Sequence, residues 1–245
     1  MLGRMVQESW AVKGIGRVAR VNKAAERTTS GPVQTPAHEV VYQQLREQIL
    51  FGEMAPGQAV TIQGLTTSLG AGMTPVREAI RRLISDGALV FQGNRRVSVP
   101  ILNSEDAEQI IYLRKTIEKE LARRAALRVK DTDIDRLTEI DNALDHAIAI
   151  GDVSGYLQGN YQFHTTLYAH ANAPVLAEIA DRLWLRFGPS LRVVCGRLGT
   201  QSLPDRHKEI LTALREGHAD VAAHALVQDV EQGMELVAAV LAEEN

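Results

Sequence analysis

The spacing of apolar residues divides the chain into a front part of short, mixed elements and a longer part that is helical throughout. Apolar side chains recur at the helical period over residues 38–52, 61–72 and 73–87, and a glycine ends each run. Two short runs typical of strands flank residues 93–96 within 88–101, which indicates a hairpin. Three helices followed by a hairpin are the parts of a winged helix-turn-helix, whose last helix enters the major groove of DNA.

From Ser104 onward the pattern is helical, with no alternation typical of strands. The expected helices are separated by glycine or proline positions and lie near residues 104–129, 132–150, 152–171, 174–195, 203–217 and 219–243. We expect Asn172 to cap the helix that has Pro174 in its first turn. The predicted fold is mainly α, with an N-terminal winged helix-turn-helix at 36–100 and a C-terminal antiparallel all-helical bundle at 101–245.

The segment MTPVREAIRRLISDGALV, residues 73–90, carries the clearest functional signal. Thr74 is a candidate N-cap and Pro75 suits the first helical position. The apolar positions would face a small core and are Val76, Ile80, Leu83 and Ile84. The arginines point elsewhere, although Glu78 could pair with Arg82 one turn away. Such a helix either approaches DNA or is an ordinary solvated surface, and the flanking elements favour DNA.

Residues 38–100 resemble the DNA-binding domain of GntR-type bacterial transcription regulators. The matching stretches are LREQILFGEMAPG, a T-x-x-x-L helix start and TPVREAIRRL…DG. The resemblance implies contacts with operator DNA from Gln63, Met73, Thr74, Arg77, Arg81, Arg82, Asn94, Arg95 and Arg96. Of three arginines usual in the family only Arg77 is kept, because Gln63 and Met73 replace the other two. An arginine–guanine contact is worth about 1–3 kcal/mol of discrimination, so we expect an unusual operator or weaker binding.

Charge is distributed unevenly along the chain. Residues 1–35 hold six Lys or Arg against two Glu, a net charge of +4. Residues 36–100 are net +1 and residues 101–245 net −8, so the front of the chain must attract phosphates. The basic extension at 1–35 is a departure from the family. It is either a flexible tail or an additional non-specific contact with DNA.

The sequence has the features of a cytoplasmic protein. Its apolar runs are too short to span a membrane, and the first residues lack the apolar core of a signal peptide. The single cysteine, Cys195, excludes an internal disulfide framework.

Several polar residues share helix faces with apolar residues and define a second candidate site. At 100° per residue, His164 lies on an apolar helix face, and Asn160 lies one turn before it on the same face. His207 and Asp229 each lie on the apolar face of a later helix. A single inward histidine is usually a hydrogen-bonded core residue, whereas an unpaired buried carboxylate is strongly disfavoured. Sharing one cavity, these four groups could hold a divalent transition metal such as Zn or Ni, with positions left open.

Arg114 and Glu118 also lie on an apolar helix face. Arg114 could neutralise an anion bound beside the metal. The alternative is an internal hydrogen-bond network in which Arg114 pairs with Glu118 and no metal binds.

Residues 104–243 resemble the helical ligand-sensing domain of the FadR-type branch, called FCD. The matching stretches are YLRKTIEKELARRAA, NYQFHTTLYAHANAPVL and DRHKEILTALREGHADVA. In metal-binding members an Asp and three His hold the ion. His164 and His207 match this set, whereas Asn160 replaces the Asp and Asp229 replaces the last His. The resemblance also implies that an arginine, here Arg114, meets the carboxylate of a small organic acid.

These features predict a homodimeric regulator that binds double-stranded operator DNA. A small carboxylate effector, with or without a metal, would control its affinity. Two alternatives remain open from sequence alone. The two histidines and the aspartate could serve a metal-dependent hydrolytic enzyme. The losses at Gln63 and Met73 could instead mark a ligand-binding dimer whose DNA contacts have degraded.

Overall fold

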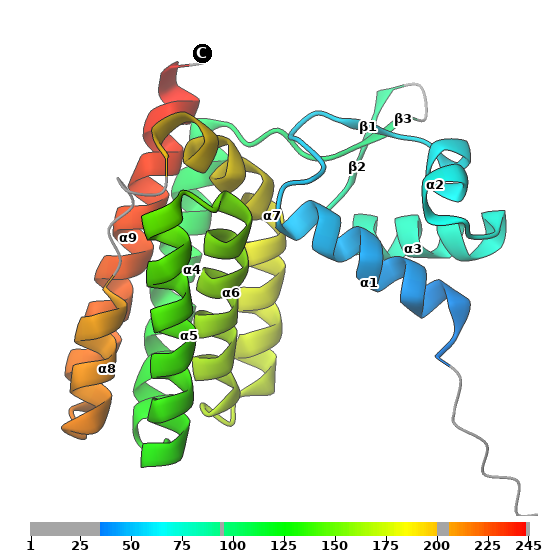
Figure 1. The fold of residues 1–245 in the computed structure, drawn as a ribbon. Coiled ribbons are helices and arrows are strands. Elements are labelled where there is room, and N and C mark those ends of the chain that lie inside the picture. The colour runs from blue at the N-terminus through cyan, green and yellow to red at the C-terminus, as the bar shows by residue number, and fades with distance from the viewer. Residues whose placement is uncertain (1–34, 94–95, 200–205, 244–245) are drawn as a thin grey trace, which may run out of the picture. The chain divides into compact units, whose positions relative to one another are not determined.

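The structure, a computed structural model, describes residues 35–93, 96–199 and 206–243. The chain from Thr35 onward forms one compact unit (Figure 1). Two predictions lie outside the described residues: the role of the basic extension up to residue 34, and the wing contacts of Asn94 and Arg95. Within the described part of the chain, no helix is both long and apolar enough to cross a lipid bilayer.

The N-terminal domain consists of three helices and a small sheet, as the hydrophobic pattern predicted. Its elements are α1 (Ala37–Leu50), β1 (Ala59–Val60), α2 (Ile62–Leu69), α3 (Met73–Ser85), β2 (Val90–Gln92) and β3 (Arg96–Ser98). Strand β3 lies between β1 and β2 and pairs antiparallel with both, so Val97 is opposite Val60 and also opposite Phe91. Strand β1 was not predicted, because two residues are too few to show an alternation.

Helix α3 begins one residue before the predicted cap. Gly72 occupies the N-cap position and Met73 is the first helical residue, so the prediction that Thr74 caps the helix is wrong. Pro75 is therefore the third helical residue. Proline is accepted there because N–H groups of the first helical turn have no partner within the helix. The buried side of the helix is apolar and consists of Val76, Ala79, Ile80 and Leu83.

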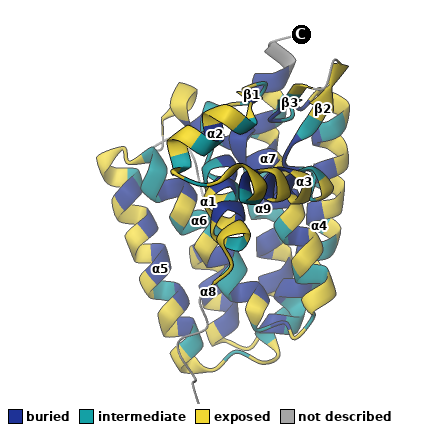
Figure 2. Cartoon of the chain, turned by 90° about the vertical axis from the view of Figure 1, so that its right-hand side faces the viewer, coloured by how far each residue is buried: buried dark blue, intermediate teal, exposed yellow. Residues whose placement is uncertain are grey.

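The C-terminal domain is a helical bundle. Its elements are α4 (Ser104–Ala126), α5 (Asp131–Ile150), α6 (Val153–Ala169), α7 (Pro174–Leu198), α8 (His207–Arg215) and α9 (Ala219–Glu243). Helix α4 packs along α9, α5 along α6, and α8 against α9 (Figure 1). Figure 2 shows that these helices turn a buried side toward one another and an exposed side outward, as amphipathic helices do. The predicted helix boundaries agree to within a few residues where the chain is described.

Asn172 does not cap α7, contrary to the prediction. Ala173 occupies the N-cap position and Pro174 is the first helical residue. Asn172 instead adopts a positive φ of 49° in the turn before the helix. Asparagine tolerates this left-handed conformation better than most residues with a side chain, so Asn172 stabilises the turn and not the start of α7.

Helix α7 contacts the N-terminal domain through α1. Gly188 lies so close to Leu50 that a Cβ atom there would be 2.2 Å from the Leu50 carbonyl oxygen. Arg46 of α1 forms an ion pair with Asp181 of α7. The Tyr161 hydroxyl of α6 donates to the same carboxylate over 2.5 Å and accepts a hydrogen bond from Arg46 over 3.1 Å. This group joins α1 to two helices of the bundle.

Candidate nucleic-acid surface and metal centre

The solvent-facing side of α3 presents the residues expected to meet DNA. Met73, Thr74, Arg77 and Arg81 are all exposed, and Gln63 is exposed on α2. Arg77, Arg81 and Arg96 of β3 line one pocket of about 550 Å³ between α3 and the sheet. Three arginines that border one hollow suit a partner that carries phosphates.

Arg82 is engaged within the domain. Its guanidinium donates to Glu39 of α1 over 2.6 Å and lies 3.6 Å from the centre of the Tyr42 ring. The expected pair between Glu78 and Arg82 is wrong, because Glu78 lies 3.5 Å from Arg81 instead. The pairing of Arg82 crosses to α1, 43 residues earlier, so helical spacing alone could not predict it. A role of Arg82 at DNA remains a prediction.

Three of the four predicted metal ligands come together inside the bundle. His164 of α6, His207 at the start of α8 and Asp229 of α9 each offer one ligand atom, and these atoms lie within 4.8 Å of one another. The Nε2 atom of His164 is 3.1 Å from Asp229 Oδ2, and that of His207 is 4.0 Å from Asp229 Oδ1. Both imidazole rings are buried. These three residues therefore share one interior site, and their role as metal ligands stays a prediction.

Asn160, the fourth predicted ligand, lies one turn before His164 on α6 and is partly buried. Its amide makes no hydrogen bond to the described ligand groups, and its role as a ligand stays a prediction. The backbone N–H of Arg206 supports the cluster from the other side, because it donates to Asp229 Oδ1 over 3.0 Å.

The Nδ1 atom of each histidine has a partner that fixes the ring. His207 Nδ1 lies 3.1 Å from Oδ1 of the buried Asp141, whose other oxygen accepts a hydrogen bond from Lys208. Burial alone would raise the pKa of Asp141, but the bonds from His207 and Lys208 hold it below the usual range. Asp141 therefore stays ionised and accepts the Nδ1–H of His207. A carboxylate behind a histidine in this way is the usual support of a metal-binding imidazole.

The other ring is fixed through a tyrosine. His164 Nδ1 lies 2.8 Å from the Tyr168 hydroxyl, which in turn donates to Glu118 Oε2 over 2.5 Å. A hydroxyl has one proton, and the carboxylate takes it, so His164 must donate its Nδ1–H to Tyr168. Burial lowers the pKa of His164 and favours the neutral ring. In the neutral ring Nε2 carries no proton and faces Asp229, whereas in the protonated ring it donates to Asp229.

The resulting centre is rich in acceptors. With both rings neutral, two Nε2 lone pairs and one carboxylate converge, so a centre without a metal needs a proton between His164 and Asp229. Burial would raise the pKa of Asp229, but a hydrogen bond from His164 and the positive charges that His207 and His164 carry when protonated hold it well below the usual range. A divalent cation resolves the repulsion among such groups, and two imidazoles with one carboxylate are a common set for zinc and its neighbours.

Arg114 and Glu118 form a buried pair next to this centre. Arg114 Nε donates to Glu118 Oε1 over 2.6 Å, and its terminal nitrogen donates to Oε2 over 3.1 Å. The guanidinium lies 4.5 Å from the ring centre of Trp184 and 4.3 Å from that of Phe187. The pairing of Arg114 with Glu118 that the alternative network requires is therefore present, and a role of these residues in effector binding stays a prediction. The pairing does not decide between a metal and a bare network, because the pair leaves both Nε2 atoms unaffected.

Sequence reasoning missed three residues that shape the centre. Asp141 follows Leu137 and precedes Leu144 on the buried face of α5, so the helical period could have found it. Tyr168 lies one turn after His164 on the buried face of α6, where its ring does not reveal what its hydroxyl bonds. Trp184 of α7 lies with its ring centre 5.1 Å from that of His164, a contact between two helices that no local pattern reveals.

Comparison with known proteins matches both halves of the chain. The FCD domain family model matches residues 109–232, and the model for bacterial regulatory proteins of the gntR family matches residues 37–99. The transcriptional regulator McbR of Escherichia coli is 26% identical over 196 residues, which are 79% of this chain and 89% of that protein. The repressor RspR of Escherichia coli is 23% identical over 214 residues, 86% of this chain and 92% of that protein.

Solved structures give the same result. That of E. coli McbR/YncC superposes with a TM-score of 0.78 at 26% identity, covering 86% of this chain and 99% of that one. A GntR-type regulator from Rhodococcus sp. RHA1 shares the fold, with a TM-score of 0.67 at 22% identity over 82% of this chain and 96% of that one.

Proposed function

Because the chain belongs to the GntR family of bacterial transcription regulators and carries an FCD domain, we propose that occupancy of the centre at His164, His207 and Asp229 controls its affinity for operator DNA. DNA-binding regulation is the function of the family, and the curated relatives and structural neighbours are regulators. The chain is therefore not an enzyme, and the alternative of a metal-dependent hydrolase is withdrawn.

The DNA contacts come from the exposed side of α3 and from the sheet. Arg77 takes the base-reading role, because it lies near the start of α3 and has no ion-pair partner among the described residues. Arg81 and Arg96 border the same hollow and attract phosphates. A homodimer would place two such surfaces on the two halves of a palindromic operator.

The metal hypothesis rests mainly on the direction of the two imidazole rings. Both Nδ1 atoms are committed to partners outside the centre, Asp141 for His207 and Tyr168 for His164. Each Nε2 is then the ring nitrogen that faces Asp229, which supplies a negative charge between them. When bound, Zn²⁺ or Ni²⁺ would use these three ligands, with Asn160 nearby, and leave positions for a small carboxylate.

The Arg114–Glu118 pair defines what an incoming carboxylate must compete with. Glu118 already occupies the guanidinium of Arg114 in the way an effector carboxylate would. An effector bound at an open metal position would therefore share or displace this internal carboxylate. Displacing it would also disturb Tyr168, whose hydroxyl donates to Glu118. Effector binding would therefore also disturb the hydrogen bond between Tyr168 and His164 Nδ1.

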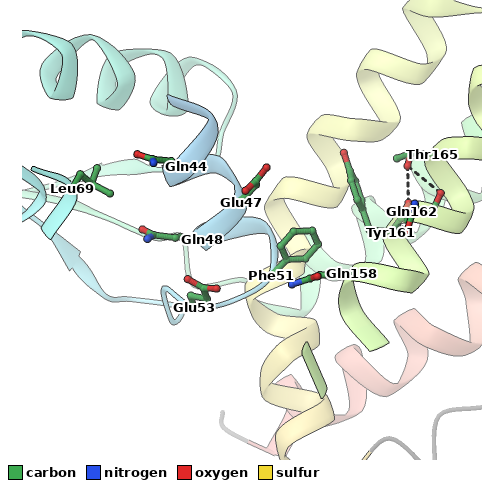
Figure 3. A pocket seen from close by; sticks show the side chains of 10 residues that line it. All are labelled: Gln44, Glu47, Gln48, Phe51, Glu53, Leu69, Gln158, Tyr161, Gln162 and Thr165. Atoms are coloured by element: carbon green, nitrogen blue, oxygen red, sulfur yellow. Dashed lines mark hydrogen bonds between the residues drawn. The ribbon is translucent and has the colours of Figure 1, made fainter. Parts of the chain in front are cut away.

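Helix α7 is the element through which the centre reaches the N-terminal domain. Trp184 contacts the rings of both His164 and Tyr161, with centroid distances of 5.1 and 5.6 Å. Tyr161 in turn bonds Asp181 and Arg46. It also borders a pocket that is lined from the other side by Glu47 of α1 and by Phe51, which directly follows α1 (Figure 3). A shift of Trp184 would therefore change how α1 packs against α6 and α7.

The DNA-binding half is tested by selecting duplexes from a random pool and measuring their affinity by fluorescence anisotropy. Arg77→Ala should weaken binding about 5–150-fold, as expected for loss of one base-reading arginine. Arg136→Ala, a surface change on α5, is the matched control and should bind as the wild type does. Failure of the wild type to enrich any sequence at low salt would favour a dimer with degraded DNA contacts.

A further inference from the structure

The first residue of α3 is an apolar side chain that faces solvent. Met73 is 54% exposed, and it lies one helical turn before Arg77. The buried side of α3 is formed by other residues, so Met73 contributes little to the core. In helix-turn-helix proteins the N-terminal residues of the second helix of the motif reach base edges in the major groove, and α3 has that place here. Met73 is therefore positioned to meet a base.

The chemistry of methionine selects among the bases. Its thioether has no hydrogen-bond donor and is only a weak acceptor. Guanine presents two acceptors in the major groove, adenine and cytosine each present an amino group, and thymine alone presents a methyl group. Packing methionine against an acceptor or an amino group removes water from a polar group without replacing its hydrogen bond. Packing it against the thymine methyl buries two apolar surfaces.

We propose that Met73 is a specificity-determining residue that contacts the C5 methyl group of a thymine, one or two base pairs from the base read by Arg77. The spacing follows from geometry. Residues four apart on a helix are separated by about 5–6 Å, and successive base pairs by about 3.4 Å. The inference rests on the proposed DNA contacts of α3.

The first test compares the sequences that three proteins select from one random pool. The wild type selects thymine beside the position set by Arg77. Met73→Ala keeps the rest of that consensus and loses the thymine preference. Met73→Arg moves the preference toward guanine, because a guanidinium can bond both guanine acceptors. Arg81→Ala, the control, weakens all sequences alike and leaves the base preferences in place.

The second test removes only the methyl group. Deoxyuridine at the selected thymine lacks C5 methyl and keeps every hydrogen-bonding atom. The wild type should bind the deoxyuridine duplex about fourfold more weakly, the ratio expected for one buried methyl group. Met73→Ala should bind both duplexes equally. Deoxyuridine placed at a thymine outside the selected site should leave the DNA affinity of both proteins unchanged.

Four results would overturn the inference. Equal wild-type affinity for the thymine and deoxyuridine duplexes excludes the methyl contact. An equal loss in the wild type and in Met73→Ala assigns the effect to the DNA rather than to Met73. An enriched operator without thymine beside the Arg77 position removes the inference but leaves the proposed function standing. Selection of no sequence at all removes both, so the two failures are distinguishable.

Discussion

His164 on α6 and Asp229 on α9 face each other across 3.1 Å, although the Nδ1–H of His164 is committed to Tyr168 on the opposite side of the ring. When His164 is neutral, the atoms that meet are a ring lone pair and a carboxylate oxygen. His207 adds a second ring nitrogen 4.0 Å from the same carboxylate. Either a proton or a metal ion must lie among these groups, and the supporting bonds of both rings favour the metal.

Metal binding is predicted to depend on the buried histidine and not on an exposed one. The wild type should bind one Zn²⁺ or Ni²⁺ per chain, and His207→Ala should reduce this to background. His224→Ala is the matched control, because His224 is exposed on α9 and lies outside the cluster. Calorimetric titration of chelator-treated protein gives the stoichiometry.

Thermal unfolding provides an independent check of the same prediction. A metal held at 100 times its dissociation constant stabilises the folded state by about 2.7 kcal/mol, so the wild type should melt at a higher temperature with metal. His207→Ala should melt at the same temperature with and without it. Retained stoichiometric binding by that variant would mean that the metal lies elsewhere.

Asp141 is predicted to act through His207. Asp141→Asn should lower metal affinity about 10–100-fold, the usual effect of removing the carboxylate behind a metal-binding histidine. Asp145→Asn is the control, because Asp145 also bonds Lys208 but is about half exposed and does not contact His207. Competition with a chromophoric chelator would measure both. Equal affinities of the two variants would assign Asp141 a structural role only.

Arg46 is predicted to couple the centre to the DNA-binding domain. Arg46→Met removes the bonds to Asp181 and Tyr161, so operator affinity should lose its dependence on metal while metal affinity stays unchanged. Tyr161→Phe should have a similar, weaker effect. Anisotropy titrations with and without metal would show this. If metal still changed the operator affinity of Arg46→Met as much as that of the wild type, the bonds of Arg46 to Asp181 and Tyr161 would not carry the coupling.

Cys195 is predicted to be inert in the folded protein. Burial raises the pKa of its thiol to about 12, so almost no thiolate exists at pH 8. A disulfide reagent should therefore react at the rate of unfolding, and reactivity should appear in the same denaturant range as the loss of helical signal. Rapid labelling of native protein at pH 8 would contradict the burial of this side chain.

Local patterns predicted most of the fold and part of the centre. Helical periodicity placed His164, His207, Arg114 and Glu118 on inward faces, and all four are buried. The period applied to α5 would also have found Asp141. Periodicity says which side of a helix faces inward, but not which groups of different helices meet. The contact of His164 with Trp184 therefore needed the structure.

The DNA-binding surface shows a similar division. The resemblance of a short motif to the GntR family pointed to Arg77 and Met73, and both residues are exposed on α3. Helical spacing paired Arg82 with Glu78, since these residues are one turn apart. In the structure Arg82 instead pairs with Glu39 on α1. This pairing depends on how α1 packs against α3, which residue spacing within one helix does not reveal.

Operator affinity with and without metal tests the central claim most directly. The measurement is an anisotropy titration of a selected operator duplex with chelator-treated protein and with the same protein loaded with Zn²⁺ or Ni²⁺. Coupling of about 1–3 kcal/mol predicts affinities that differ 5–150-fold in the wild type and in His224→Ala, and no difference in His207→Ala. Identical wild-type affinities in both states, with and without small carboxylates, would contradict control of DNA binding by this centre.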